Sequence, residues 1–288
     1  MLIRILAALL GIATSACVST REVHSLGDPS PGPTSTSTET SHFICWNVHK
    51  ASDEQFTLEV KDLLDALPKN SGVILCMQEV RSSTYDLIRN LHREEISGHY
   101  APSWRFPFSR HSTGVLTVGN QPLPASSAVS LRASRRELLV ASPKVSLLTE
   151  TPLSCGRKLQ IINCHGLNFV PFSVFKNQLD EIFAPHHDHD SPSIVCGDFN
   201  VWSEQRLDML ARKAAEVGLS EVHPHGPVDS PAPQWLRVLK RFNGFDPDIR
   251  LDRIYTRGIE VLGCRCHGES ESSDHLPLIL NYRILPAS

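Results

Sequence analysis

Residues 194–203 carry the sequence IVCGDFNVWS, and this stretch decides the fold. Its apolar, β-rich start ends at Asp198, and Ser203 stands where a side-chain cap precedes a helix. Apolar residues then recur at helical spacing from residue 207, until Gly218 ends the pattern. The stretch predicts a buried strand, a polar turn and an amphipathic helix, which together are typical of an α/β protein.

The same alternation of strand and helix signals runs along most of the chain. Short β-rich runs predict further strands at 43–48, 73–77, 114–118, 138–141, 145–149, 159–164, 253–256 and 276–282. Helical spacing predicts further helices near 56–67, 84–93 and 172–183. No internal repeat interrupts this order. We therefore expect one domain over 42–285, an α/β sandwich of four layers in which two mixed sheets pack face to face with helices outside.

The first 17 residues have the pattern of a signal peptide. One positive charge in residues 1–4 precedes a continuous apolar run over 5–13, which is too short to span a bilayer permanently. Small residues lead to Cys17, and Ser-Ala-Cys resembles the cleavage box of bacterial lipoproteins, although Thr14 departs from the Leu usual there. Two alternatives stay open, lipidation at Cys17 with membrane anchoring and simple secretion. Both predict export to the bacterial cell envelope or beyond.

Residues 18–41 are rich in Pro, Ser, Thr and Gly and lack apolar periodicity, which predicts a disordered linker. The whole chain has 288 residues, of which 41% are apolar and 20% charged, and this composition excludes a disordered or multi-span membrane protein. A net charge of −3 argues against a protein held on nucleic acid by a bulk positive field. We expect a monomer.

Seven cysteines follow Cys17. Four of them lie inside apolar runs and are predicted to be small buried core residues, namely Cys45, Cys76, Cys164 and Cys196. The other three lie near turn residues, and in an exported protein two of them could pair as one disulfide; they are Cys155, Cys264 and Cys266.

Polar residues recur where the apolar strands stop. They are Asn47, Glu79, His165, Asp198 with Asn200, Asp252, and Asp274 with His275. Each one alone is explained by a turn, in which Asp and Asn are common. Together they predict one site, because neighbouring strand ends lie about 4.8 Å apart and can converge on one ligand. Carboxylates suit a hard cation such as Mg²⁺, and imidazoles suit proton transfer.

The motifs around these residues resemble one family. In order they are CWNVHK, ILCMQEVR, STGVLTVG, INCHGLNF, IVCGDFNVWS, LDRIY and SSDHLPL, between about residues 42 and 283. They resemble the endonuclease/exonuclease/phosphatase superfamily, which includes DNase I, and look most similar to bacterial members without an assigned function. The resemblance implies a DNase I-like sandwich and hydrolysis of a phosphate ester that depends on Mg²⁺ or Mn²⁺.

The resemblance also implies roles for single residues. Glu79 matches the family's metal-binding Glu, Asn47 the Asn that orients the site or the metal, and Asp274 the acid that supports metal binding. Arg81 resembles an Arg that contacts phosphate, a contact also expected of Asn200.

The catalytic roles implied by the resemblance fall on five residues. Asp198 and Asn200 match the pair that polarises the attacking water and holds the phosphate, and His165 matches the His that stabilises or protonates the leaving oxygen. His275 matches the family's terminal His, and Asp252 matches the acid that orients it. Whether Asp198 or His275 is the general base stays open at this point.

Three functions remain in view. The first is an exported, nuclease-like phosphodiesterase that acts by in-line attack of water. The second is a phosphatase or phospholipase C-type enzyme acting on a lipid or sugar phosphate, because members of one fold differ in the loops that choose the substrate. The third, of another class, is a catalytically inactive binding lipoprotein. Substrates in view are therefore nucleic acid, phospholipid and phosphosugar.

Overall fold

The computed structural model describes residues 22–26, 40–51, 54–68, 71–84, 96–105, 110–137, 143–185, 190–225, 250–268 and 270–286. The signal peptide with Cys17, the strand expected at 138–141 and most of the helix expected at 84–93 lie outside these residues. Within the described part of the chain, no helix is both long and apolar enough to cross a membrane.

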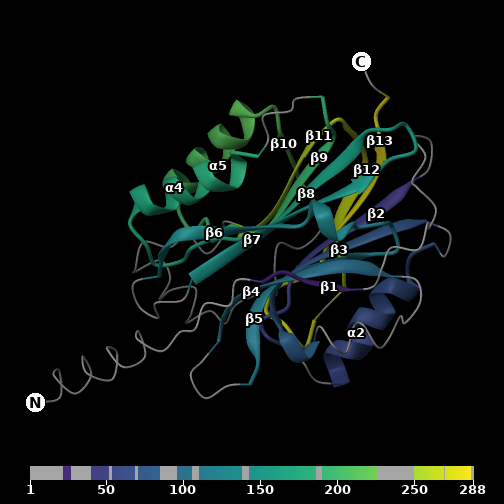
Figure 1. The fold of residues 1–288 in the computed structure, drawn as a ribbon, viewed down its shortest axis with the longest axis horizontal. Coiled ribbons are helices and arrows are strands. Elements are labelled where there is room, and N and C mark those ends of the chain that lie inside the picture. The colour runs from purple at the N-terminus through teal and green to yellow at the C-terminus, as the bar shows by residue number, and fades with distance from the viewer. Residues whose placement is uncertain are drawn as a thin grey trace, which may run out of the picture.

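Two mixed β-sheets form the centre of the domain (Figure 1). The first contains, in spatial order, β1 (His24–Leu26), β4 (Ser97–Arg105), β5 (Ser112–Gly119), β3 (Gly72–Arg81), β2 (Ser41–Asn47), β13 (Leu278–Ile284) and β12 (Ile259–Cys266). The second contains β10 (Ser220–Val222), β11 (Asp252–Arg257), β9 (Ser193–Asp198), β8 (Lys158–His165), β7 (Pro143–Pro152) and β6 (Val129–Arg136). In each sheet one pair is parallel, β2 with β3 and β8 with β9.

Helices cover the outer faces of the two sheets, as Figure 1 shows. Helix α2 (Glu54–Asp65) buries Phe56, Val60 and Leu63, which lie on one face, against the outer face of the first sheet. Helices α4 (Phe172–Phe183) and α5 (Glu204–Glu216) cover the second sheet, and the Ser203 hydroxyl caps α5. A further apolar layer lies between the sheets. The predicted α/β sandwich is confirmed.

Several elements differ from those predicted. Strands β4, β6, β10 and β12 were not expected, and a short 3-10 helix covers Ala125–Ser127. The prediction of a disordered linker over 18–41 does not hold for His24–Leu26, which pair with β4 as an antiparallel edge strand. Pairing to an existing sheet edge satisfies backbone groups without any apolar periodicity, so composition gave no signal for it.

The cysteine predictions have a mixed outcome. Cys45, Cys76, Cys164 and Cys196 are buried, as expected. All seven described thiols are free, so the structure does not contain the disulfide considered for Cys155, Cys264 and Cys266.

One polar contact joins the two sheets at the end where the predicted site residues lie. Asn163 of β8 is fully buried, and its amide nitrogen donates to the carbonyl oxygens of Met77 (3.1 Å) and Leu116 (2.9 Å) in the first sheet. Its Oδ1 accepts a hydrogen bond of 2.7 Å from Nε2 of Gln78. Both ends of the buried Asn163 amide group are hydrogen-bonded to the first sheet, and this contact holds the two sheets together.

We expect Asn163→Leu to lower the free energy of unfolding by about 2–3 kcal/mol, because Gln78 and two buried carbonyl groups would lose their partner. Urea unfolding of the mutant and the wild type measures this difference. Gln160→Leu, a half-buried position of the same strand, serves as the control and should change stability by less than about 1 kcal/mol. Equal stability of Asn163→Leu and wild type would show that the contact between the sheets is dispensable.

Candidate active site

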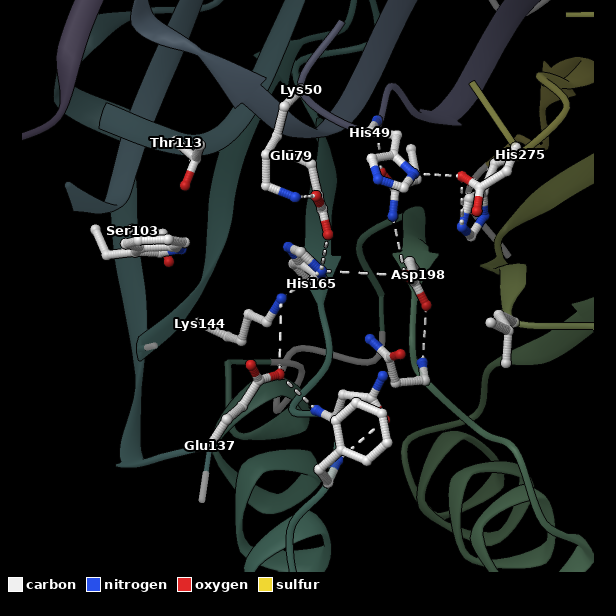
Figure 2. A pocket seen from close by; sticks show the side chains of 18 residues that line it. His49, Lys50, Glu79, Ser103, Thr113, Glu137, Lys144, His165, Asp198 and His275 are labelled. Carbon is white, nitrogen blue, oxygen red and sulfur yellow. Dashed lines mark hydrogen bonds and ion pairs between the residues drawn. The ribbon is translucent and has the colours of Figure 1, made fainter. Parts of the chain in front are cut away.

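A cavity of about 470 Å³ opens at the end of the sandwich where strands from both sheets terminate (Figure 2). Seven of the residues predicted from the sequence line it, namely Asn47, Glu79, His165, Asp198, Asn200, Asp274 and His275. Asp252 lies directly behind this lining and contacts His275. Arg81 does not line the cavity. Its side chain is exposed, and its partner in the neighbouring strand β5, Thr113, lines the cavity.

Strand register brings these residues together. In the second sheet His165 ends β8 beside Asp198, which ends the parallel strand β9, and Asp252 begins the antiparallel strand β11 opposite Asp198. Gly197 permits this approach, because a Cβ atom there would lie 2.0 Å from the Cys164 carbonyl oxygen. Three of the predicted site residues therefore meet at one edge of the sheet.

A β-bulge turns Glu79 into the cavity. In a regular strand Gln78 and Glu79 would point to opposite faces. The register of β3 with β5 shifts between Met77 and Val80, and Glu79 has a left-handed φ of 56°. As a result Gln78 contacts the second sheet through Asn163, and Glu79 also faces that sheet. Strain of this kind in a residue other than Gly is a feature of functional sites.

Two amides hold the carboxylate of Asp198. Its Oδ2 accepts a hydrogen bond of 3.0 Å from Nδ2 of Asn47, and its Oδ1 accepts one of 2.9 Å from the backbone N–H of Asn200. Asn200 has a φ of 52° and also donates from its side chain to the Gly166 carbonyl oxygen. Asp198 is buried, so its orientation in the cavity is fixed.

The loop that carries His275 is attached to β2. The indole N–H of Trp46 donates to the His275 carbonyl oxygen at 2.9 Å, and the Ser273 hydroxyl donates to the Asn47 carbonyl oxygen at 2.7 Å. The other side of the imidazole is held by Asp252, whose Oδ2 contacts Nδ1. Burial opposes a charge on His275, but Asp252, with Asp198 and Asp274, outweighs it and raises the pKa of His275 well above its ordinary value.

Lys144 is a site residue that the sequence did not single out. It is buried, lines the cavity, and places its ammonium nitrogen 2.8 Å from Nε2 of His165 and 3.7 Å from the buried carboxylate of Glu137 (Figure 2). An ammonium group only donates hydrogen bonds, so Nε2 of His165 accepts and the imidazole is neutral in this arrangement. Burial and the charge of Lys144 lower the pKa of His165 to about 4. Burial and Lys144 thus favour the neutral form of His165, and the ammonium group of Lys144 is the positive charge beside it.

Glu79 lies between three cationic or basic groups. Its Oε2 contacts the ammonium group of Lys50, and its Oε1 lies 3.5 Å from Nε2 of His165. Burial opposes ionisation, but His165, Lys144 and Lys50 lower the pKa of Glu79 to about 2, so its carboxylate is charged at neutral pH. His165 becomes an imidazolium ion only at acid pH, near its pKa of about 4.

Asp274 and His49 form a pair at the rim of the cavity. Nδ1 of His49 lies 2.6 Å from Oδ1 of Asp274, and both side chains are largely exposed. The hydrogen bond to Asp274 raises the pKa of His49. His49 and Lys50 were given no role from the sequence, although both lie within three residues of the end of β2 at Asn47. Their left-handed φ values of 44° and 63° turn them over the cavity.

The donor set suits a hard cation that takes few protein ligands. Among the residues that the structure describes, no three His, Cys, Asp or Glu side chains group closely enough to hold a metal ion by themselves. Mg²⁺, however, usually takes one or two carboxylates and completes its coordination with water and substrate oxygens. The charged carboxylate of Glu79, with oxygen donors of Asn47 and Asp274 on the same cavity, fits that requirement.

Comparison with known proteins shows the family to which the chain belongs. The model of the Endonuclease/Exonuclease/phosphatase family matches residues 44–275, and the chain belongs to this family. Membership of this family supports an activity of the phosphoesterase type. A UPF0294 protein of Yersinia pseudotuberculosis is 29% identical over 259 residues, which is 90% of this chain and 87% of that protein.

Solved structures show the same fold at low identity. An endonuclease/exonuclease/phosphatase from Beutenbergia cavernae superposes with a TM-score of 0.62 at 16% identity, over 86% of this chain and 72% of its own. ANGEL2, described as a 2′,3′-cyclic phosphatase, superposes with a TM-score of 0.59 at 16% identity, over 92% of this chain and 98% of its own. These two likenesses concern the fold.

We expect Lys144→Met to raise the pKa of His165 from about 4 towards its ordinary value of about 6.5, because removal of a neighbouring positive charge favours the imidazolium form. A pH titration of the imidazole nitrogens by NMR in metal-free protein measures this shift. Lys158→Met, which removes an exposed lysine at the start of β8, is the matched control and should leave the titration unchanged. An unchanged pKa of His165 in Lys144→Met would contradict the assigned contact.

Proposed function

We propose that this protein is a nuclease-like hydrolase of phosphodiesters that requires Mg²⁺ or Mn²⁺. The observation that carries the proposal is the convergence of Asn47, Glu79, His165, Asp198, Asn200, Asp274 and His275 on one cavity from both sheets. The description of ANGEL2 as a 2′,3′-cyclic phosphatase supports phosphodiester chemistry on this fold.

Glu79, Asn47 and Asp274 would hold the cation. When bound, the cation would neutralise charge on the phosphate and on the departing oxygen. Lys50 contacts Glu79 and would move away from that carboxylate as the cation binds, towards the phosphate that enters with it.

We assign the role of general base to Asp198. The hydrogen bonds from Asn47 and Asn200 fix both of its oxygens and leave lone pairs that can accept a proton from water. Water attacks phosphorus in line with the leaving oxygen, its proton passes to Asp198, and the bond from phosphorus to the leaving oxygen breaks with its electron pair on that oxygen. His275 is paired with Asp252 and serves as a charged donor to a phosphate oxygen.

Lys144, together with Asn200, would stabilise the negative charge on the phosphate. The ammonium group of Lys144 is held by Glu137 and His165 on the wall of the cavity, and it offers hydrogen bonds to the phosphate or to the departing oxygen. Preorganised donors in a buried site stabilise developing charge more than water does. The retention of a complete, mutually oriented set of side chains argues against an inactive binding lipoprotein.

Export is part of the proposal. The pattern of residues 1–17 supports a signal peptide, and Cys17 supports lipidation, with simple secretion as the alternative. Palmitate labelling of the full chain and of Cys17→Ser distinguishes the two. Label that is lost in the variant supports the anchor, and label that persists there excludes Cys17 as its site.

We expect the purified protein to hydrolyse bis(4-nitrophenyl) phosphate and to relax plasmid DNA with Mg²⁺, and EDTA to abolish both activities. Glu79→Gln, Asp198→Asn and His275→Ala should each lower kcat by about 100-fold or more, because each removes a charge or a proton acceptor at the reacting phosphate. Initial rates measure these effects.

Glu216→Gln, which changes an exposed carboxylate of α5, is the matched control and should keep the wild-type rate. Folded wild-type protein that hydrolyses no diester, phospholipid or phosphosugar with Mg²⁺ would overturn the proposed function. Activity that survives EDTA would exclude its dependence on a cation.

A further inference from the structure

A buried arginine holds the loop that follows β8. Arg206 donates to the carbonyl oxygens of Leu167 (3.1 Å) and Val170 (2.7 Å). Its guanidinium group lies between the rings of Phe175 and Trp202, at 4.5 Å and 4.4 Å from their centroids. A guanidinium group buried in this way has a fixed orientation, so both ends of the segment 167–170 are fixed to the body of the domain.

Two further side chains hold the same loop from the other side. Gln178 of α4 accepts from the backbone N–H of Leu167 at 2.7 Å and donates to the His165 carbonyl oxygen at 3.2 Å. Glu137, the partner of Lys144, accepts from the backbone N–H of Asn168 at 2.8 Å. The loop is therefore rigid, and it is connected directly to the groups that surround the candidate reaction centre.

Phe169 is the residue that this rigid loop leaves exposed. It lines the cavity, yet 43% of its surface is accessible to solvent. Its backbone has a left-handed φ of 45°, which is a rare conformation for a bulky residue, and its N–H donates to Oδ1 of Asn168. An aromatic side chain held in a strained conformation at the mouth of a polar cavity indicates a binding role.

From this arrangement we propose that Phe169 is a stacking platform for a nucleobase, so that the substrate class is a single-stranded nucleic acid or a short nucleotide diester. The inference rests on the proposed function, because the stacked base would carry the phosphate that reaches Asp198. Trp104 of β4 lines the same cavity and adds an aromatic ring from the first sheet. Aromatic side chains that stack on bases are the usual means of binding unpaired nucleotides.

The size and the rim of the cavity favour a nucleotide over a lipid surface. A volume of about 470 Å³ is in the range of pockets that enclose one small organic group. Among the described residues, six large apolar side chains are exposed, and Phe169 is the one of these that lines the cavity. Insertion into a bilayer usually needs a larger apolar face, whereas stacking needs a single flat ring.

The test compares the binding of AMP and ribose 5-phosphate by calorimetry in buffer with Mg²⁺. Both carry a phosphate on ribose, and AMP alone carries a base. We expect the wild type to bind AMP about tenfold more tightly, from the usual strength of one stacked base. Phe169→Ala should bind both about equally, and Phe169→Tyr should keep the preference.

Leu58→Ala, which truncates an exposed apolar side chain of α2, is the matched control and should keep the tenfold preference. If Phe169→Ala fails to fold, Phe169→Leu keeps the bulk without the ring and should lose the preference in its place. An equal affinity of the wild type for both ligands, or a preference that survives both variants, would overturn the inference.

Binding to lipid vesicles tests the remaining alternative, in which Phe169 contacts a membrane. Loss of binding to phosphatidylglycerol vesicles in Phe169→Ala, with the preference for AMP unchanged, would also overturn the inference, because it would assign Phe169 to a membrane. The preference for AMP is measured without turnover. Its absence in a protein that hydrolyses diesters therefore contradicts this inference alone, and an inactive protein contradicts the proposed function alone.

Discussion

The contact between Gln78 and Asn163 is the constraint on which the site depends. Regular alternation would send one of the neighbours Gln78 and Glu79 away from the second sheet, and the bulge in β3 is what allows both to face it. Asn163 fixes the first of them by a buried hydrogen bond of 2.7 Å. Glu79 is consequently brought to His165, two residues further along the same strand as Asn163. Fold stability and site geometry thus share one buried polar contact.

Charge is paired around the cavity almost residue by residue. The carboxylates of Glu79, Glu137, Asp252 and Asp274 face Lys50, Lys144, His275 and His49, respectively. Asp198 differs, because two amide donors hold it at hydrogen-bond distance while His165 lies 4.0 Å away. Neutral amide donors therefore orient Asp198, whereas a cationic or basic group faces each of the other four acids.

The sequence was sufficient to predict the α/β sandwich and the polar residues at the strand ends. Apolar runs that stop at Asp198 and His165 are visible along the chain, and register carries them to one edge. Lys144 could not be found in this way, since a lysine at the start of a strand is usually solvated and only the tertiary fold buries it. The bulge at Glu79 and the pairing of β1 depend on contacts distant in sequence, and local propensity does not encode such contacts.

The central claim is that this fold brings Glu79 to a cavity where it binds a divalent cation. Calorimetric titration of Mn²⁺ into metal-free protein tests it most directly, because binding is measured without any assumption about the substrate. We expect saturable binding by the wild type and its loss in Glu79→Gln, with the unfolding temperature of the two proteins within a few degrees. Equal binding of Mn²⁺ by both proteins, or none by the folded wild type, would contradict the account.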